Sequence, residues 1–263
     1  MQIAGSSVLL TGATGGIGEA IARELHTRNA TLTLTGRRAK VLEPLAAELN
    51  ARALTADLSD RVQLERLLDE AGEVDILVAN AALPASGRLE SFSIEQIDRA
   101  IEVNLRAPIV LARALLPAML ARERGHLLFV SSLAGKVFTP GASVYSAAKA
   151  GLRGFASALR ADLHGSGVGV SAVFPGFIRD AGMFADTNVE LPKGVGTRTP
   201  QDVARAVLSA IERDRGEVDV APLSLRVGAM FAGFAPDLSS SVSRRLGSEG
   251  IAREVADAQR EKR

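Results

Sequence analysis

Short apolar runs with a preference for β-structure alternate with longer helical patterns along this chain of 263 residues. Several of the runs are continuously hydrophobic, as in strands that are buried on both faces of a sheet. Alternating strands and helices predict an α/β fold, a single doubly wound (Rossmann) domain whose seven-stranded parallel sheet has helices on both faces. The strands are expected at 6–12, 31–36, 52–57, 74–80, 125–132, 168–176 and 217–222, and the helices at 16–29, 39–50, 60–71, 93–121, 143–165 and 200–214.

Composition excludes several classes of protein. Lys and Arg number 31 against 30 Asp and Glu, without a long basic run, so we expect no nucleic-acid partner. The chain has no cysteine, and its three histidines lack the spacing of metal ligands, so neither disulfides nor a metal site are expected. The N-terminus does not resemble a signal peptide, and no run of 18 apolar residues occurs. We therefore predict a cytoplasmic protein with no membrane span.

The first expected strand leads into the sequence TGATGGIG at 11–18. Its glycines, Gly12, Gly16 and Gly18, allow a tight turn and a close approach of the backbone to a pyrophosphate at a helix N-terminus. An ordinary strand-to-helix turn is the alternative interpretation. The position of the motif, directly after the first strand and before an amphipathic helix, favours dinucleotide binding.

The end of the second strand, LTGRRAK, bears on the choice of cofactor. Gly36 stands where an acidic residue would bind the ribose 2′-hydroxyl of NAD, and Arg37 and Arg38 follow. Guanidinium groups suit a phosphate, so we predict that NADP(H) is preferred and that NAD(H) is possible, although two solvated arginines would give the same pattern. Asp57 ends the third strand, where it either accepts a hydrogen bond from the adenine amino group or caps the next helix.

Tyr145 is the only tyrosine of the chain, and Lys149 follows it by four residues, on the same face of a helix. A nearby ammonium is expected to lower the pKa of the phenol by about one to three units. Such a phenol exchanges a proton with an alcohol or a carbonyl, as hydride transfer at carbon requires. Ser132 ends the fifth strand upstream, where it either hydrogen-bonds the substrate oxygen or caps a turn.

The motif TGATGGIG occurs together with ADL at 56–58, VNL at 103–105, VSS at 130–132, YSAAK at 145–149 and PGFI at 175–178. In this order they resemble the short-chain dehydrogenases/reductases, specifically the main branch of that family. The resemblance extends from about residue 5 to residue 222.

The resemblance implies a role for each matching residue. Tyr145 would be the acid or base, Lys149 would lower its pKa and bind the nicotinamide ribose, Ser132 would orient the carbonyl, and Asn104 would help hold a water that links Lys149 to solvent. The family also implies a homodimer or homotetramer, packed through helices like 93–121 and 143–165. The residues expected to bind the cofactor are Gly12, Thr14, Gly16, Ile17, Gly18, Arg37, Arg38, Asp57, Leu58, Asn80, Ala81, Tyr145, Lys149, Pro175, Gly176 and Ile178.

The sequence departs from the family pattern at three positions. Ala82 replaces a glycine, Asp180 stands where threonine is frequent, and Gly15 stands where NADP-preferring members often have a basic residue. The first two changes lie next to the expected cofactor site. The third removes one of the two features that would favour NADP(H).

The expected domain organisation divides the chain once. Residues 1–222 form the dinucleotide-binding catalytic domain, including a substrate loop at 179–200, and residues 223–263 form a C-terminal extension packed on it. Within the lid at 179–196, Met183, Phe184 and Leu191 are expected to join Phe138 around an apolar pocket, with core packing or a disordered loop as the alternatives. For the apolar stretch 223–236 a lid or subunit contact is favoured over a weak membrane-surface anchor.

The sequence therefore predicts an oxidoreductase that transfers hydride between NADP(H) and a carbonyl or secondary alcohol, with a lipophilic substrate. A dinucleotide-sensing regulator without turnover is the alternative. Such a regulator would be expected to lack one of the three reactive side chains, and all are present. An epimerase or dehydratase of nucleotide-linked sugars fits less well, because those relatives space their glycines as GxxGxxG.

Overall fold

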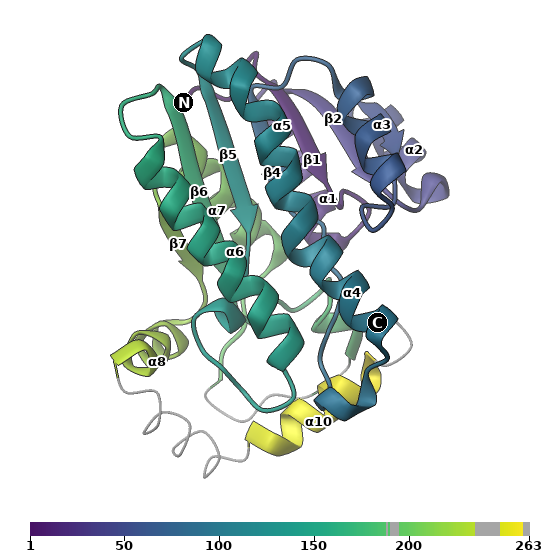
Figure 1. Cartoon of the computed structure of the whole chain (residues 1–263), viewed down its shortest axis with the longest axis vertical. Coiled ribbons are helices and arrows are strands. Elements are labelled where there is room, and N and C mark those ends of the chain that lie inside the picture. The colour runs from purple at the N-terminus through teal and green to yellow at the C-terminus, as the bar shows by residue number, and fades with distance from the viewer. Residues whose placement is uncertain (188, 190–194, 235–247, 260–263) are drawn as a thin grey trace.

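The computed structural model describes every residue except 188, 190–194, 235–247 and 260–263. Within the described residues, seven parallel strands form one sheet in the order β3-β2-β1-β4-β5-β6-β7 (Figure 1), which confirms the predicted fold class. The strands are β1 (Ser7–Thr11), β2 (Thr31–Gly36), β3 (Arg52–Thr55), β4 (Ile76–Ala79), β5 (Gly125–Val130), β6 (Val168–Pro175) and β7 (Glu217–Val220).

The helices follow the expected ranges closely. The predicted helix 93–121 is divided into α4 and α5 by a π-helical turn, η2 (Glu102–Arg106). The short 3₁₀ turns are η1 (Leu89–Ser91), η3 (Leu133–Gly135) and η4 (Ala185–Thr187). The α-helices are α1 (Gly16–Thr27), α2 (Ala39–Glu48), α3 (Arg61–Ala71), α4 (Ile94–Ile101), α5 (Ala107–Ala121), α6 (Ser143–Asp162), α7 (Pro200–Glu212), α8 (Leu223–Phe234) and α10 (Ser248–Ala258).

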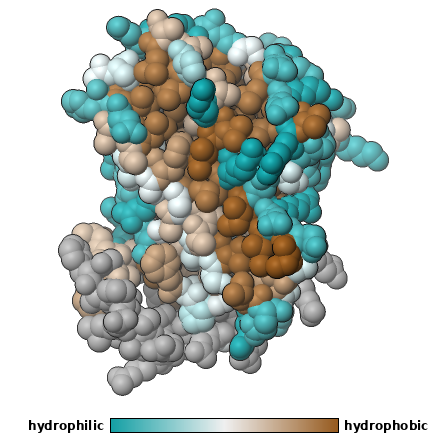
Figure 2. All heavy atoms as spheres, in the orientation of Figure 1, coloured by the Kyte–Doolittle hydropathy of each residue, from teal (hydrophilic) through white to brown (hydrophobic). Residues whose placement is uncertain are grey.

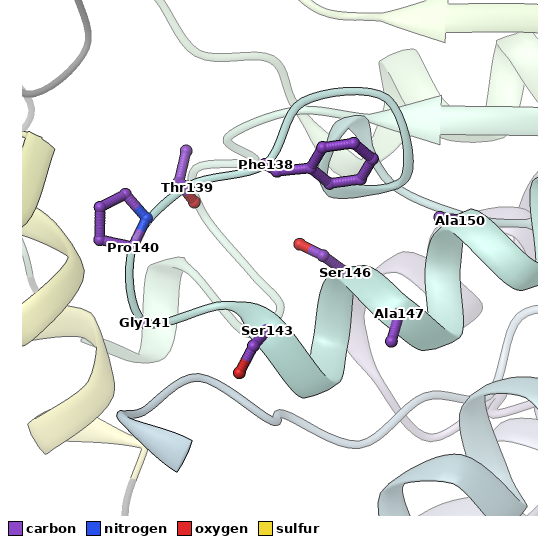
Figure 3. Close-up of a pocket in the computed structure, with 8 residues that line it drawn as sticks. All are labelled: Phe138, Thr139, Pro140, Gly141, Ser143, Ser146, Ala147 and Ala150. Carbon is purple, nitrogen blue, oxygen red and sulfur yellow. The ribbon is translucent and has the colours of Figure 1, made fainter. Parts of the chain in front are cut away.

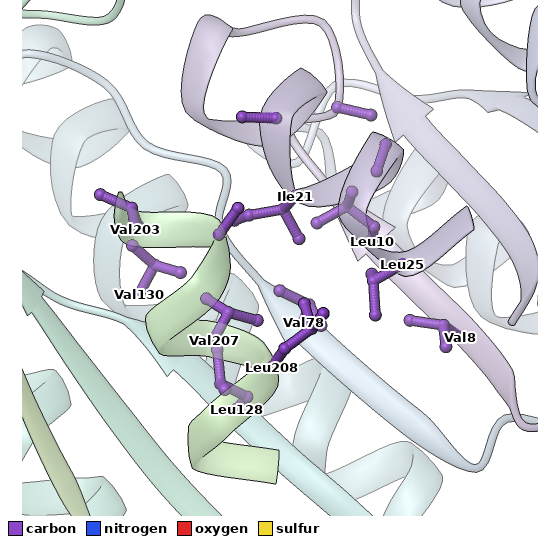
Figure 4. Close-up of a cluster of buried hydrophobic side chains, with 14 of the residues drawn as sticks. Val8, Leu10, Ile21, Leu25, Val78, Leu128, Val130, Val203, Val207 and Leu208 are labelled. Atoms are coloured by element: carbon purple, nitrogen blue, oxygen red, sulfur yellow. The ribbon is translucent and has the colours of Figure 1, made fainter. Parts of the chain in front are cut away.

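Helices cover both faces of the sheet, which explains the continuously apolar strands. On one face, Leu10 of β1 belongs to the same buried cluster as Ile21 of α1 and Val207 of α7 (Figure 4). The neighbouring residue of β1, Leu9, points to the opposite face, into a cluster that includes Leu111 of α5. Successive strand residues are therefore buried on alternate faces, and both must be apolar.

The strand order also determines where a ligand binds. From β1 the chain proceeds outward to β2 and β3, and it then returns to place β4 on the other side of β1. In open α/β sheets the crevice at such a reversal, beyond the carboxyl ends of the strands, is the binding site. Helices α8 and α10 lie at this end of the sheet (Figure 1).

One stretch of the described helices, Ile94–Ala121, is long and apolar enough to cross a membrane, and its most apolar 18-residue window has a mean hydropathy of 1.4. Of its most apolar window, 44% is buried inside the molecule. Core helices of soluble proteins have the same length and composition, so this property is weak evidence for a span.

Candidate active site

A cleft of about 1490 Å³ opens at the carboxyl ends of the strands. It brings together Ser132, Tyr145 and Lys149 with every residue that the sequence predicted to bind the cofactor. Asn104 is the one predicted site residue that does not line it. Gly36, Ala82 and Asp180 are also part of its wall.

The glycine turn at the mouth of α1 is closely packed. Gly12 has a φ of +69°, and a Cβ there would lie 2.7 Å from the Cα of Ala81. A Cβ on Gly18 would lie 2.1 Å from the carbonyl oxygen of Gly12. Gly15 caps α1 without a side-chain hydrogen bond, so the helix begins with free N–H groups next to the cleft. This geometry fits a pyrophosphate.

Thr11 holds this turn, although its role was not apparent from the sequence. Its Oγ1 accepts hydrogen bonds from the backbone N–H groups of Asn80 and Ala81, each at 3.0 Å. Asn80 in return donates from Nδ2 to the carbonyl oxygens of Thr11 at 3.0 Å and Gly12 at 3.3 Å. The Asn80 amide therefore links the ends of β1 and β4. The only sequence signal for Thr11 was its position immediately before Gly12.

Three arginines surround the end of the cleft next to β2 and β3. Arg37 Nη1 and Arg99 Nη2 lie 3.7 Å and 3.5 Å from the same carboxylate oxygen of Asp57. Arg38 donates to the carbonyl oxygen of Thr14 in the glycine turn. Arg99 comes from α4, where the sequence gave no reason to expect a site residue.

The alternative in which Asp57 caps a helix is wrong. The N-cap of α3 is Asp60, whose carboxylate accepts from the N–H of Val62 at 2.9 Å. Asp57 instead accepts from the backbone N–H and the hydroxyl of Ser59, at 2.9 Å and 2.7 Å. Burial opposes ionisation of Asp57, but these hydrogen bonds and the two guanidinium groups outweigh it and hold its pKa below the usual value.

The three reactive side chains converge on one wall of the cleft. Lys149 is fully buried, and its Nζ donates to the carbonyl oxygen of Val130 at 3.0 Å. Ser132 Oγ accepts from the N–H of Ala134 at 3.1 Å, so Ser132 caps η3 and also lines the cleft beside Tyr145. Both roles that the sequence left open for Ser132 are therefore compatible.

The predicted lowering of the pKa of Tyr145 is wrong for this structure. Burial raises its pKa to about 12, and a side-chain hydrogen bond with Ser132 acts in the opposite direction. Lys149 Nζ lies 5.8 Å from the centre of the phenol ring, is directed at Val130, and has a pKa lowered by burial to about 8. Spacing on a helix indicated that the two side chains are neighbours, but it did not reveal that Lys149 is fully buried and Tyr145 partly buried.

Asn104 lies in the π-helical turn and is fully buried. Its Oδ1 accepts from the N–H of Leu83 at 2.9 Å, and its Nδ2 donates to the carbonyl oxygen of the same residue at 3.0 Å. The side chain thus fixes the segment that follows β4. Its predicted part in holding a water stays a prediction.

An ion cluster supports the segment after Ser132. Lys136 Nζ lies 2.6 Å from Asp219 Oδ1 and 2.8 Å from Glu217 Oε2, both on β7, and 3.9 Å above the ring of Phe174. The two carboxylates are more than 80 residues from Lys136 along the chain. No local sequence pattern could have identified the cluster.

The substrate side of the cleft is lined by the segment after β6. Met183 and Phe184 line it as predicted, and the rings of Phe184 and Phe177 are 4.9 Å apart. Phe138 lines the cleft, is 62% exposed and also borders a second pocket of about 550 Å³ (Figure 3). Leu191 lies outside the described residues. Asp180 is exposed and lies 3.4 Å from Arg179.

In the described part of the chain, no group of three or more His, Asp or Glu residues is placed to hold a metal ion.

Comparison with known proteins finds several whose sequences are similar to this chain. A sequence profile described as short chain dehydrogenase matches residues 6–191. The chain is 39% identical over 227 residues to the ketoacyl reductase HetN of Nostoc sp., a match that covers 83% of this chain and 79% of that protein. It is also 31% identical over 216 residues to the 3-oxoacyl-[acyl-carrier-protein] reductase FabG of Rickettsia conorii, covering 79% of this chain and 89% of that protein.

A solved structure has the same fold. The short-chain dehydrogenase from Sphingobium yanoikuyae in complex with NADPH superposes with a TM-score of 0.77 at 28% identity. The match covers 89% of this chain and 95% of that one.

Proposed function

Because the chain belongs to the short-chain dehydrogenase/reductase family, we propose that it is an oxidoreductase that transfers hydride between NADP(H) and a carbonyl or secondary alcohol. One observation carries the proposal: Ser132, Tyr145 and Lys149 meet on one wall of the cleft that also contains the glycine turn. A regulator without turnover would have no use for three reactive side chains held together in this way.

The residues present fit a nicotinamide dinucleotide. The glycine turn has no room for a Cβ at Gly12 or Gly18, and the uncapped start of α1 offers N–H groups to a pyrophosphate. The ends of β4 and β6, at Asn80 and Pro175, border the rest of the cleft. When bound, the cofactor supplies or accepts the hydride.

The preference for NADP(H) rests on positive charge next to β2. Arg37, Arg38 and Arg99 all line the cleft there, and the carboxylate of Asp57 lies next to Arg37 and Arg99. A ribose 2′-phosphate would meet planar guanidinium donors and displace Arg37 and Arg99 from their long contacts with Asp57. The NADPH in the Sphingobium relative supports this assignment.

The environment of Tyr145 indicates which group donates the proton to the substrate oxygen. With a pKa of about 12, its phenol carries a proton at neutral pH and acts as the acid during carbonyl reduction. Ser132, which shares a hydrogen bond with Tyr145, donates to the developing alkoxide and orients the carbonyl. Lys149 keeps the helix in place through Val130 and stabilises the phenolate that remains.

The substrate side supports a lipophilic carbonyl compound. Met183 and Phe184 face the cleft together with Leu225 of α8. The ketoacyl substrates named for the relatives from Nostoc and Rickettsia combine a ketone with an apolar chain, so we propose a β-ketoacyl compound as the first class to test. The C-terminal extension, through α8 and α10, completes this wall.

The outer face of α5 and α6 supports the predicted homo-oligomer. Apolar side chains gather over these helices (Figure 2), among them the half-buried Leu116 and Phe155 and the exposed Leu120. Two copies packed through this face would bury these groups. Light scattering on the purified chain measures the mass and decides between monomer, dimer and tetramer. The cytoplasmic location stays a prediction.

The activity is tested in two steps. Fluorescence titration with NADPH and NADH measures cofactor affinity, and we expect NADPH to bind more tightly. Oxidation of NADPH is then followed with a panel of β-ketoacyl, aromatic and steroid ketones and small sugars. Turnover confined to the apolar ketones supports the proposal, whereas binding of NADPH without turnover of any carbonyl favours the regulator.

A further inference from the structure

Gln259 follows the end of α10 and is buried, with 5% of its surface exposed. It is one of the residues that line the cleft, together with Val255 one turn earlier in the same helix. The residue is separated by more than 100 positions from Ser132 and Tyr145, yet the fold places all of them around one cavity. A buried amide requires hydrogen-bond partners.

One end of the amide is bonded to the substrate segment. Gln259 Nε2 donates to the carbonyl oxygen of Met183 at 3.1 Å. This bond also decides which end of the amide is which, because the opposite orientation would bring two acceptor oxygens together.

The acceptor at Met183 is itself held in place. The next residue, Phe184, accepts from the backbone N–H of Thr187 at 3.0 Å and from its hydroxyl at 2.7 Å. These bonds close the turn that contains η4, against which α10 packs. The position of the Gln259 side chain is therefore determined from two directions, by its own helix and by this turn.

The other end of the amide has no partner. Gln259 Oε1 is buried and makes no hydrogen bond with any described residue. Leaving a buried acceptor unpaired is costly, and few such atoms occur in the described part of this chain. The atom belongs to a residue of the cleft wall, where Met183 and Val255 provide no donor side chain. No described residue supplies a donor to this atom, so we look for the donor on a ligand in the cleft.

We propose that Gln259 is a specificity-determining residue, whose Oε1 accepts a hydrogen bond from an uncharged donor, an amide N–H or a hydroxyl, on the substrate. The inference rests on the proposed function and adds a second requirement to it: the substrate carries this donor in addition to its carbonyl. Ser132 and Tyr145 recognise the carbonyl, and Gln259 recognises the rest of the molecule. Aliphatic ketones without a donor are then poor substrates, even where their size fits.

Two matched pairs of substrates test the proposal. The first is the N-acetylcysteamine thioester of a β-keto acid and its N-methylated counterpart, which lacks the amide N–H. The second is the hydroxyethyl ester of the same acid and its methoxyethyl ester. In the wild-type enzyme we expect the donor-bearing member of at least one pair to have a kcat/KM about tenfold higher. The pair that responds identifies the donor as an amide or a hydroxyl.

The variant Gln259→Leu removes the acceptor and keeps the approximate size of the side chain. In this variant we expect the two members of the responding pair to have nearly equal kcat/KM, mainly because KM for the donor-bearing member rises. The affinity for NADPH should not change. Gln201→Leu is the matched control, because Gln201 is exposed on α7 and does not line the cleft. A ratio of about one in the wild type for both pairs overturns the proposal, and so does a ratio that persists in Gln259→Leu.

A binding measurement separates this inference from the proposed function. The same pairs are titrated into the NADPH complex of Tyr145→Phe, and each dissociation constant is measured. If the wild type turns over no carbonyl but the donor-bearing member still binds about tenfold more tightly, the activity is wrong and the role of Gln259 stands. Equal dissociation constants within both pairs overturn the role of Gln259, whatever the turnover.

Discussion

The two walls of the cleft are constructed differently. The cofactor wall consists of short turns that directly follow β1, β2 and β4, and several of its polar groups are bonded to one another, as in the contacts among Thr11, Gly12 and Asn80. The substrate wall is assembled from the segment after β6 and from α8 and α10, and it contains a buried oxygen without a partner at Gln259. The cofactor wall is thus built from neighbouring turns, although it too contains a buried oxygen without a partner, Thr35 Oγ1 on β2. The substrate wall depends instead on segments that are far apart in the sequence.

The reaction itself takes place where the walls meet, so removing its acid has the largest expected effect. Tyr145→Phe removes the proton donor but not the ring, and we expect turnover to fall by about 10²–10⁴-fold while the dissociation constant of NADPH stays the same. Ser146→Ala is the control at the next position, since Ser146 does not line the cleft. Full activity in Tyr145→Phe would mean that another group supplies the proton.

A buried histidine near the amino ends of the strands, far from both walls of the cleft, predicts how stability depends on pH. His126 on β5 is buried, its Nε2 lies 2.9 Å from Ser171 Oγ, and burial lowers its pKa to about 4. The unfolded chain binds this proton near pH 6.5, so the free energy of unfolding decreases as the pH falls from about 6.5 to 4, by up to about 3 kcal/mol.

Urea unfolding at several pH values measures that slope. His126→Asn should reduce it in this range, whereas a change at the exposed His164, His164→Asn, should leave it in place. An unchanged slope in His126→Asn would assign the acid sensitivity to other groups.

The close packing of the cofactor wall predicts a smaller loss. In Gly18→Ala the new methyl group would lie 2.1 Å from the carbonyl oxygen of Gly12, so the turn must move. We expect a loss of about 1–3 kcal/mol in stability, together with weaker binding of NADPH. Gly154→Ala on α6 is the control, because a Cβ there meets no atom within 4 Å and alanine favours a helix. Equal melting temperatures for the two variants would contradict the steric argument.

The charge at the adenosine end predicts a change in cofactor preference. Arg37→Ala removes one guanidinium next to Asp57, and we expect the preference for NADPH over NADH to fall about tenfold. Arg99→Ala should act in the same direction. Titration with both cofactors measures the preference, with Arg66→Ala on the exposed surface of α3 as the control. A preference that is unchanged in both Arg37→Ala and Arg99→Ala would remove the physical basis for NADP(H).

The smallest effect is expected on the substrate wall at α8. Met230 is 65% exposed, and Met230→Ser should change the free energy of unfolding by less than about 0.5 kcal/mol. Leu225 lies on the same helix but lines the cleft, so Leu225→Ala should raise KM for a long acyl chain and leave NADPH binding intact. A large loss of stability in Met230→Ser would indicate that this face is covered by a partner.

The difference between the walls also explains what the sequence predicted. The strands, the glycine turn and the Ser132, Tyr145 and Lys149 set were predicted because local patterns determine them. Arg99, Lys136 and Gln259 were missed because their partners are distant in the sequence. The pKa of Tyr145 was expected to fall and instead rises, since depth of burial cannot be read from the spacing of two residues.

The π-helical turn between α4 and α5 has a consequence for deletions. A turn of this kind contains one residue more than an α-helical turn, and here it directs Asn104 at the backbone of Leu83. Deleting one residue from Glu102–Arg106 would restore regular helix, and because the wide turn absorbs its extra residue, α4 and α5 would keep nearly the same rotation relative to each other. The bulge that directs Asn104 at Leu83 would then be lost, and the segment after β4 would lose both of these hydrogen bonds, although every reactive side chain would still be present.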